Sequence, residues 1–515
     1  MITFKKLEKK GRLGNQLFQI AATLGFADKF KQECVFPNWT YNGYFNQKLQ
    51  IGDVECGIDV LETSFHFCDY QMLNDSALNE NINFEGYFQS EKYFVNIKNK
   101  ILKLFKFDAD FVSQIKRKYY NALNKKTIAI HIRRGDYVDN PNYECLPINY
   151  YLTALFENFT NWQSYNIVIF SDDIPYCKVH FDCSENVFFA DGNEIECLCL
   201  GSLCDNFIIS NSTYSWWMAW LAEKKGTKII RPKSYFAGEL KNNCDTKDLY
   251  PERWIIHDHK PNNILKLIDL KDVTFTIPVS YDHPDRKQNL SLNICFLQSH
   301  FSTNIIVSEQ GGSFFQYMEK YCTYFNFKTM VWFHRTKMLN EMAKLSTTPI
   351  IANWDADVII PPLQLWLTVD AIRKGADVCY PYKWAFARIP RKPYFKQIEK
   401  DIDIGVIRDT KFNGMNNNDN TSVGGAVFFN KESFFKGGGE NENFVSFGPE
   451  DAERFYRFTK LDFIIKRTLG AIYHINHWVG PNSSNKHPHV QKNRNEWAKI
   501  ILMSKTELLN YIKKW

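Results

Sequence analysis

The sequence lacks the features that mark several common protein classes. It contains no apolar run of about 18 residues, so we expect no membrane span. The opening residues, MITFKKLEKK, include no apolar signal region. Its 13 cysteines include no pair at C-x-x-C spacing, which argues against a structural zinc site. Unpaired cysteines without a signal region predict a cytoplasmic protein.

The chain also lacks a large excess of either positive or negative charge. The 63 Lys and Arg residues nearly balance 57 Asp and Glu residues, for a formal net charge of +6. This bias is too small to indicate a nucleic-acid-binding protein. The chain is 44% hydrophobic and 23% charged, which excludes wholesale disorder. At about 150 residues per domain, 515 residues predict two or three domains. An aromatic content of 16% is compatible with a carbohydrate enzyme.

Apolar runs that end in polar residues divide the chain into two α/β halves. Such runs are typical of parallel strands that lead into functional loops. Loops at one edge of a sheet can converge on a cleft. The runs of the first half are 127–137, 166–173 and 206–225, and those of the second are 273–282, 304–312, 349–360 and 376–382. Between the halves, 258–272 is predicted to be a connector with a short amphipathic helix. The polar stretch 391–422 is predicted to be a long surface loop.

Two motifs in the first half could bind an anion. His131-Ile132-Arg133-Arg134-Gly135-Asp136 places two guanidinium forks after a strand, where they can bind phosphate oxygens. The alternative is an Arg–Asp cluster that merely caps the strand. Ser212 and Thr213 precede a helical pattern, and a helix N-terminus favours anions. The alternative there is an ordinary helix cap.

The order of these motifs adds specificity. GRLGNQLFQ, GYFQSEKYF, HIRRGDYV, FSDD and SNSTYSWW resemble, over residues 11–257, the inverting alpha-1,2-fucosyltransferase family. The resemblance implies GDP-fucose as donor, no required metal and Arg133 as the catalytic residue on the donor pyrophosphate. The other GDP-fucose-binding residues that it implies are His131, Arg134, Asp136, Asp172, Asp173, Asn211, Ser212, Thr213, Gly14 and Gln16. Asp136 and Glu85 could each act as general base, and this role stays unassigned.

The second half contains acidic and imidazole candidates for a metal site. Asp355 and Asp357 follow an apolar strand at i and i+2, a spacing that lets both carboxylates chelate a hard cation. His474 or His477 could complete the site, although histidines more often pack or bond locally. Glu450-Asp451 could take a proton from an acceptor hydroxyl, or could simply favour the start of a helix.

Here too the motifs form an ordered set. TIPVSYDHPDR, IIVSEQGG, HRTKMLN, WDADVIIP, GGAVFF, FGPEDAER and YHINH resemble, over 273–480, metal-dependent GT-A glycosyltransferases of the beta-1,4-galactosyltransferase type. The resemblance implies Asp451 as catalytic base and Glu450 as a sugar-binding residue. It assigns Mn²⁺ or Mg²⁺ to Asp355, Asp357, His474 or His477, and UDP-sugar contacts to Arg286, Arg335, Asp355 and Asp357. Phe447-Gly448-Pro449 departs from the family's Trp-Gly-Trp-Gly, so the acceptor sugar stays open.

The combined prediction is a bifunctional glycosyltransferase of α/β class. A GT-B-like pair of Rossmann-like lobes (1–260) would be joined by a linker (261–272) to a GT-A nucleotide-diphospho-sugar transferase domain (273–515). The first would transfer L-fucose in alpha-1,2 linkage to a galactose-like sugar, and the second a hexose from a UDP-hexose. The acceptor would be an oligosaccharide or glycoconjugate in a microbe or a virus-infected cell, with no nucleic-acid partner. Two alternatives remain: an active fucosyltransferase with a non-catalytic sugar-binding module, and a lectin-like scaffold without activity.

Overall fold

The computed structural model describes residues 1–70, 79–327, 331–383, 385–407, 422–480, 482, 484 and 486–515. It divides into two compact units. The first unit comprises Met1–Ile174 and Asn186–Lys266, and the second comprises Pro175–Glu185 and Leu267–Trp515. Helix α6 (Ile174–Phe181) falls at this division. Each unit is described by itself below.

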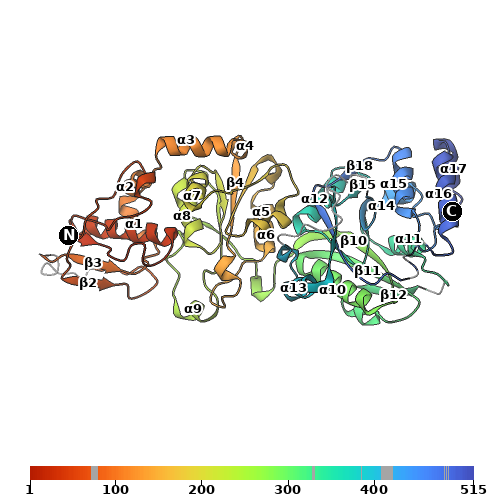
Figure 1. Ribbon diagram of the computed structural model, residues 1–515, viewed down its shortest axis with the longest axis horizontal. Helices are drawn as coiled ribbons and strands as arrows, with labels where there is room; N and C mark the ends of the chain where they lie inside the picture. The colour runs from red at the N-terminus through yellow and green to blue at the C-terminus, as the bar shows by residue number, and fades with distance from the viewer. Residues whose placement is uncertain are drawn as a thin grey trace. The chain divides into compact units, whose positions relative to one another are not determined.

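The first unit begins with a small parallel sheet covered by a long helix. The sheet has the order β1-β3-β2, formed by β1 (Ile2–Thr3), β2 (Ile58–Leu61) and β3 (Ile82–Glu85). Helix α1 (Leu13–Phe30) lies beside it (Figure 1). Its apolar side chains are buried almost all round because α1 also packs against a second helix. Phe18 of α1 lies 4.5 Å from the ring of Trp216 and 5.1 Å from that of Trp217, centroid to centroid.

A six-stranded parallel sheet forms the rest of the first unit among the described residues. All six residues of its central strand β4 are buried, as expected for a parallel strand covered on both faces. The order is β6-β5-β4-β7-β8-β9, from β4 (Thr127–Ile132), β5 (Asn166–Ser171), β6 (Val187–Phe189), β7 (Asn206–Ile208), β8 (Ile229–Pro232) and β9 (Ile255–His257). The polar motifs thus follow the carboxyl ends of neighbouring strands.

The remaining helices of the first unit flank these sheets. They are α2 (Lys98–Leu104), α3 (Ala109–Lys118), α4 (Tyr120–Leu123), α5 (Ile148–Asn158), α7 (Glu194–Ser202), α8 (Thr213–Ala222) and α9 (Gly238–Asn243). Helix α8 carries three fully buried tryptophans, Trp216, Trp217 and Trp220. They form part of one aromatic core with α1, so the start of α8 is held firmly next to the start of α1.

The second unit is built on a mixed sheet. Its order is β12-β11-β10-β13-β17-β15-β18, from β10 (Ile268–Ser280), β11 (Phe301–Gln310), β12 (Thr323–Phe327), β13 (Ile350–Trp354), β15 (Val378–Tyr380), β17 (Ala426–Asn430) and β18 (Ile465–Arg467). Strands β10 to β13 pair in parallel, whereas β17 runs antiparallel to both of its neighbours. A smaller sheet has the order β14-β19-β16, from β14 (Val358–Ile359), β16 (Ala385–Ile389) and β19 (Ala471–Ile475).

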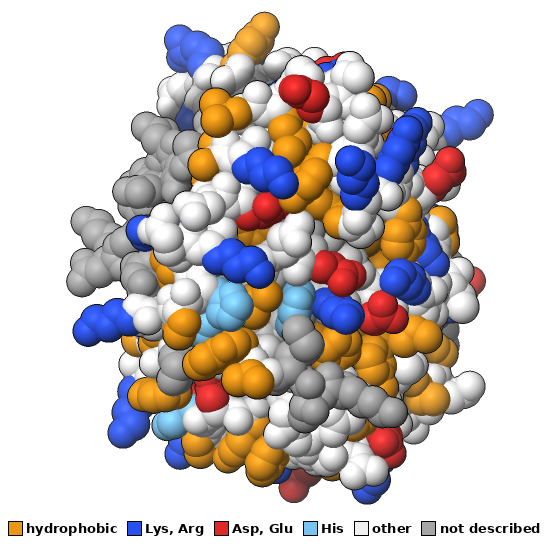
Figure 2. All heavy atoms as spheres, turned by 90° about the vertical axis from the view of Figure 1, so that its right-hand side faces the viewer, with side chains coloured by type: hydrophobic (Ala, Val, Ile, Leu, Met, Phe, Trp, Pro, Cys, Tyr) orange, Lys and Arg blue, Asp and Glu red, His pale blue; other side chains and the backbone are white. Residues whose placement is uncertain are grey.

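Helices cover the second unit and close its C-terminal end. They are α10 (Pro284–His300), α11 (Arg335–Leu345), α12 (Pro362–Arg373), α13 (Arg391–Asp401), α14 (Lys431–Lys436), α15 (Glu450–Lys460), α16 (Val490–Leu502) and α17 (Lys505–Ile512). In the described ranges no helix has both the length and the apolarity to cross a membrane. On the face drawn in Figure 2, basic and acidic side chains are interspersed with apolar ones.

Two sequence-based expectations about local structure are wrong. The connector 258–272 was predicted to contain an amphipathic helix, but β10 already begins at Ile268. Its alternating buried and exposed residues, starting with Ile268 and Leu270, have the period of a strand. The stretch 391–422 was predicted to be a loop, but it begins with α13, which buries Phe395 and Ile398. Its part at 408–421 lies outside the described residues.

Candidate functional sites

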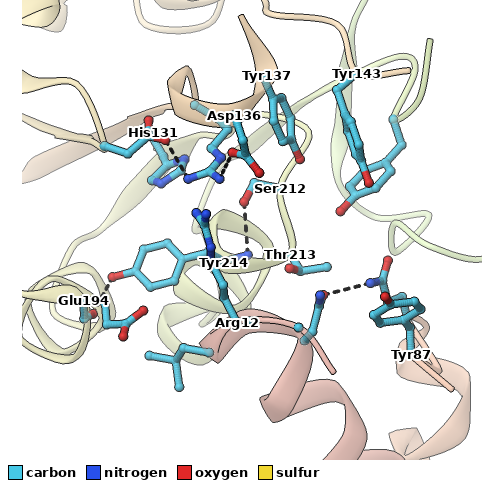
Figure 3. A pocket seen from close by; sticks show the side chains of 18 of the residues that line it. Arg12, Tyr87, His131, Asp136, Tyr137, Tyr143, Glu194, Ser212, Thr213 and Tyr214 are labelled. Carbon is cyan, nitrogen blue, oxygen red and sulfur yellow. Dashed lines mark hydrogen bonds and ion pairs between the residues drawn. The ribbon is translucent and has the colours of Figure 1, made fainter. Parts of the chain in front are cut away.

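A cavity of about 770 Å³ lies between the two sheets of the first unit. Figure 3 shows side chains from both sides of the unit that line it. Six residues predicted from the first-half motifs line it together with Gly14: His131, Arg133, Asp136, Asp172, Ser212 and Thr213. They come from the ends of β4, β5 and β7 and from the start of α1, so the chain brings distant motifs to one place.

Arg133 stands at the end of β4 with its guanidinium held from two sides. One nitrogen lies 2.6 Å from Asp172, and another is ion-paired with Asp136. The guanidinium also lies over the ring of Tyr137, 5.2 Å from its centroid. Its side chain is 15% exposed. A guanidinium fixed in this way is preorganised to donate hydrogen bonds to an anion in the cavity.

His131, two residues before Arg133 on β4, is buried. Its Nδ1 is 2.9 Å from the hydroxyl of Ser210. Burial, reinforced by the Arg133 charge, lowers the pKa of His131 to about 3. The imidazole is therefore neutral at neutral pH and adds no second positive charge beside Arg133.

Two helix N-termini meet in this cavity. The Ser212 hydroxyl caps α8 by accepting a hydrogen bond from the backbone N–H of Tyr214 at 3.3 Å. Gly14 in the first turn of α1 approaches so closely that a Cβ there would lie 2.6 Å from that backbone nitrogen and 2.8 Å from the Thr213 hydroxyl. Free N–H groups and two helix dipoles therefore point into one space, which favours an anion.

Arg134 and Asp173 were also predicted to contact the ligand, but they lie outside the residues that line the cavity. They face each other, with 3.4 Å between Arg134 Nε and the Asp173 carboxylate, and each side chain is less than a tenth exposed. The backbone N–H of Arg134 donates to Asp172 at 2.9 Å. Both residues thus brace the loops after β4 and β5.

Gln16 and Asn211 likewise bind protein groups and lie outside the cavity lining. Gln16 accepts from Trp39 Nε1 at 2.9 Å and donates to the Gly11 carbonyl at 3.1 Å. Asn211 donates to the carbonyls of Glu144 and Tyr235 at 3.1 and 3.0 Å. Their roles in the structure are to hold the chain that carries Gly14 and Ser212.

The structure distinguishes between the two candidates for a general base. Asp136 lines the cavity, whereas Glu85 does not. The Glu85 carboxylate pairs with Lys6 at 2.7 Å instead. Of the two, only Asp136 is placed to contact a ligand in this cavity.

Several cavity residues were missed at the sequence level. One end has an aromatic wall formed by Phe65, Tyr87, Tyr143, Tyr235 and Phe236. Arg12 and Glu194 also line the cavity, and Figure 3 shows Glu194 on the side away from Tyr87 and Tyr143. Isolated aromatics in an aromatic-rich chain carry no sequence signal. Arg12 lies inside the quoted GRLGNQ motif, so it could have been found there.

The second unit brings Asp357, His474 and His477 into one cluster. Strand β14 pairs antiparallel with β19 so that Val358 faces His474, which places this imidazole beside Asp357. The Nε2 atoms of His474 and His477 lie 3.5 and 2.9 Å from the two carboxylate oxygens of Asp357. Burial works to raise the pKa of Asp357, but the two imidazoles and Arg286 outweigh it and hold this pKa below its ordinary range.

The donor atoms of this cluster fit a divalent cation. Asp357 Oδ1 and His474 Nδ1 are buried and accept or donate no hydrogen bond within the described part of the chain. One carboxylate and two imidazoles form a ligand set typical of divalent transition metals. Orphaned buried polar atoms are otherwise costly, so their presence supports a cation site here.

Asp355, the other acid of the D-x-D motif, is outside this cluster. Its carboxylate accepts from Arg335 at 2.9 Å, and Arg335 lies 3.3 Å from Asp451. Arg454 joins the chain of ion pairs, 2.8 Å from both Asp451 and the fully buried Glu440. Arg335 thus links the D-x-D motif to the Glu450-Asp451 motif.

Glu450 and Asp451 begin α15 and differ in electrostatic environment. Burial and the Asp451 carboxylate raise the pKa of Glu450. Burial also acts on Asp451, but the Arg335 and Arg454 guanidiniums lower its pKa below the ordinary value. Neighbouring carboxyls with pKa values pushed apart are typical of acid–base sites.

Arg286, the last of the predicted contacts, lies at the cation cluster. Its guanidinium is 3.1 Å from Asp357 and 3.4 Å from Asp282. The predicted residues of the second half thus fall into two groups. Asp357, His474, His477 and Arg286 form one. Arg335 joins Asp355 and Asp451 in the other, with Glu450 next to Asp451 at the start of α15.

Comparisons with known proteins identify a family for the first half of the chain. Residues 2–257 match the model of glycosyl transferase family 11. The O-antigen biosynthesis glycosyltransferase WbnK of Escherichia coli is 32% identical over 45% of this chain and 95% of its own length. The alpha-1,2-colitosyltransferase of Escherichia coli is 29% identical over 48% of this chain and 96% of its own. The catalytic domain of Drosophila beta1,4-galactosyltransferase 7, solved with xylobiose, aligns with a TM-score of 0.24 and 15% identity over 38% of this chain and 63% of that chain.

Proposed function

The chain belongs to glycosyl transferase family 11, and from this membership we propose that its first unit transfers L-fucose from GDP-fucose to a galactose-like sugar in alpha-1,2 linkage. The observation that carries the proposal is the convergence of Arg133 with the N-termini of α1 and α8 in one cavity. A GDP leaving group is a diphosphate, and this arrangement is complementary to it. We assign residues 1–260 to this module and regard its two sheets as a GT-B-like pair of lobes.

The proposed reaction breaks the bond between the anomeric carbon and the β-phosphate oxygen. Negative charge grows on the diphosphate as this bond lengthens. Arg133, fixed by Asp172, donates hydrogen bonds to the departing oxygens, and the free N–H groups near Ser212 and Thr213 add their dipoles. The acceptor hydroxyl attacks from the opposite face, with inversion. Asp136 is the acid nearest to these groups, but the base role stays open.

Two sugars are candidates for the group that the donor carries. Relatives of this chain are named both as an alpha-1,2-colitosyltransferase and as a galactoside 2-alpha-L-fucosyltransferase from Caenorhabditis elegans, the latter 25% identical over 76% of its length. GDP-colitose is therefore the second candidate donor. A direct competition between GDP-fucose and GDP-colitose, with products identified by mass spectrometry, distinguishes the two.

For the second unit we propose transfer of a hexose, galactose or a similar sugar, from a UDP-sugar with inversion. The observation that carries this proposal is the pairing of a cation cluster, Asp357, His474 and His477, with the acid pair Glu450 and Asp451. We assign residues 273–515 to this module, as a GT-A-like domain. The predicted linker 261–272 overlaps the first residues of β10, which begins at Ile268. Mn²⁺ or Mg²⁺ bound at the cluster would supply Lewis-acid stabilisation of the diphosphate.

The residues of this chain divide the remaining work. Asp355 and Asp451 hold the guanidinium of Arg335 between the two acidic motifs. Its remaining N–H groups can donate hydrogen bonds to the donor phosphates. Asp451, whose pKa is lowered, is ionised at neutral pH and can accept the proton of the attacking hydroxyl. Glu450, whose pKa is raised, can keep its proton and donate a hydrogen bond to a sugar hydroxyl.

We further propose that the second module makes the terminal residue that the first module then fucosylates. The test measures GDP release from GDP-fucose and UDP release from a panel of UDP-sugars, followed by mass spectrometry with galactose-terminated acceptors. Release of both nucleotides supports two active modules. GDP release alone supports the alternative, a fucosyltransferase with a sugar-binding second module. If neither nucleotide is released, both proposals are wrong.

A further inference from the structure

Glu194 is an acid in the first-unit cavity that has no ion-pair partner among the described residues. Three carboxylates line this cavity: Asp136, Asp172 and Glu194. The first two are ion-paired with Arg133. In the described part of the chain no Lys, Arg or His is ion-paired with Glu194, which is exposed. The cavity therefore offers one carboxylate that remains available for a ligand.

The position of this carboxylate is fixed from both sides. Asn193 caps α7 with a capping box, so the helix start that carries Glu194 is well defined. The Tyr214 hydroxyl donates to the Glu194 backbone carbonyl at 2.6 Å. The Tyr41 hydroxyl donates to Glu194 Oε1, which orients the carboxylate. Each carboxylate oxygen has two acceptor sites, so most of its acceptor capacity is left for a ligand.

The place of Glu194 in the cavity indicates which part of the ligand it meets. The diphosphate is expected at Arg133 and the two helix N-termini, in the middle of the cavity. From there the donor extends in two directions, to the nucleoside and to the sugar. One direction leads to Tyr87 and Tyr143, whose rings suit a sugar face, and Glu194 lies the other way (Figure 3).

The side of the cavity that carries Glu194 is also the side on which we expect the nucleoside. Gly192 after β6 and Cys197 of α7 lie close to Glu194 in the sequence and line the cavity with it, and Phe170 and Ser171 at the end of β5 line the same cavity. Nucleotides in such folds lie beyond the carboxyl ends of the strands. Asp172, the cavity acid that directly follows β5, has its carboxylate bound to Arg133 instead.

Guanine and adenine differ in the edge that each base can present to a carboxylate. Guanine presents two neighbouring donors on one edge, the ring N1–H and the 2-amino group, and a carboxylate can accept from both. Adenine presents a ring acceptor at the equivalent place, which a carboxylate repels. We propose that Glu194 is the residue that selects guanine in the donor nucleotide. This inference rests on the proposed transfer from a GDP-sugar by the first unit.

The test measures binding of GDP, IDP and ADP to the full-length chain by calorimetry, with EDTA present to silence the second unit. IDP lacks only the 2-amino group. The wild type is expected to bind GDP more tightly than IDP, and IDP more tightly than ADP. Glu194→Gln keeps an acceptor for Tyr41 but removes the charge, so GDP affinity should fall roughly 10- to 100-fold. The preference for GDP over IDP should largely disappear, while ADP affinity should rise because the carboxylate that repels the adenine ring acceptor is gone.

A matched control separates this role from a structural one. Glu196→Gln changes an acid on the same helix that lies outside the cavity lining and preserves the capping box. It should leave all three affinities as in the wild type. An unchanged preference for GDP over IDP in Glu194→Gln would overturn the inference while leaving the transfer proposal intact. If the wild type bound none of the three nucleotides, the proposed donor of the first unit would fail as well.

Discussion

Replacement of Arg133 by alanine tests the proposed anion site most sharply. The guanidinium is the cationic side chain that Asp136 and Asp172 orient toward the centre of the cavity. Loss of one preorganised donor group at a developing charge typically slows catalysis about 10²- to 10³-fold, or roughly 3–4 kcal/mol. We expect kcat/KM for fucosyl transfer to fall by that factor in Arg133→Ala. Arg133→Lys, which keeps the charge but not the planar fork, should recover part of it.

The stability of the variant decides how the rate is interpreted. The Asp136 and Asp172 side chains are 55% and 26% exposed, so the loss of their partner should cost less than about 1 kcal/mol. Such a change corresponds to only about 2–4 °C in Tm. Arg253→Ala is the matched control, because Arg253 is also paired with two carboxylates, Glu91 and Glu223, but lies outside the cavity lining. If folded Arg133→Ala kept its rate within tenfold of wild type, the proposed role of Arg133 would be refuted.

Three further predictions concern other parts of the two sites. Asp357→Asn should abolish UDP release and leave GDP release unchanged, measured in the same preparation, and parallel loss of both would contradict independent sites. Gly14→Ala should slow fucosyl transfer at least about tenfold, because its Cβ would lie 2.6 Å from a backbone nitrogen of α8, and an unchanged rate would show that the two helix ends need not meet. His131 stays neutral when folded, with its pKa lowered from 6.5 to about 3, so only the unfolded chain gains this proton as pH falls below about 6.5. Acidification should therefore destabilise the wild type more than His131→Gln by up to about 1.4 kcal/mol per pH unit, and equal slopes of Tm against pH would be inconsistent with that pKa.

The sequence sufficed to predict the strands and motifs that depend on local pattern. The runs at 127, 166 and 206 became β4, β5 and β7, with polar residues at the same sheet edge. This is why Arg133 and Asp172, which are distant in sequence, were expected near each other. The alternation of apolar and polar residues at Ile268 and Leu270 was also present in the sequence. Its period of two indicates a strand, so the predicted helix was wrong.

Other features depend on tertiary contacts that no local pattern contains. The direction of a side chain after a strand decides whether it faces a ligand or the protein, and Arg133 and Arg134 differ in this way. Asp355 was grouped with Asp357 on spacing, but Arg335 comes from a separate helix and binds it. Helix α13 forms in a polar stretch because Phe395 and Ile398 find a core to pack against.

We propose that one chain carries two independent transfer sites, only one of which requires a metal. The most direct measurement compares GDP release from GDP-fucose and UDP release from UDP-sugars in the same wild-type preparation, with Mn²⁺ and with EDTA. We expect GDP release under both conditions and UDP release with Mn²⁺ alone. Loss of both activities in EDTA, or UDP release that is equal under the two conditions, would contradict the claim.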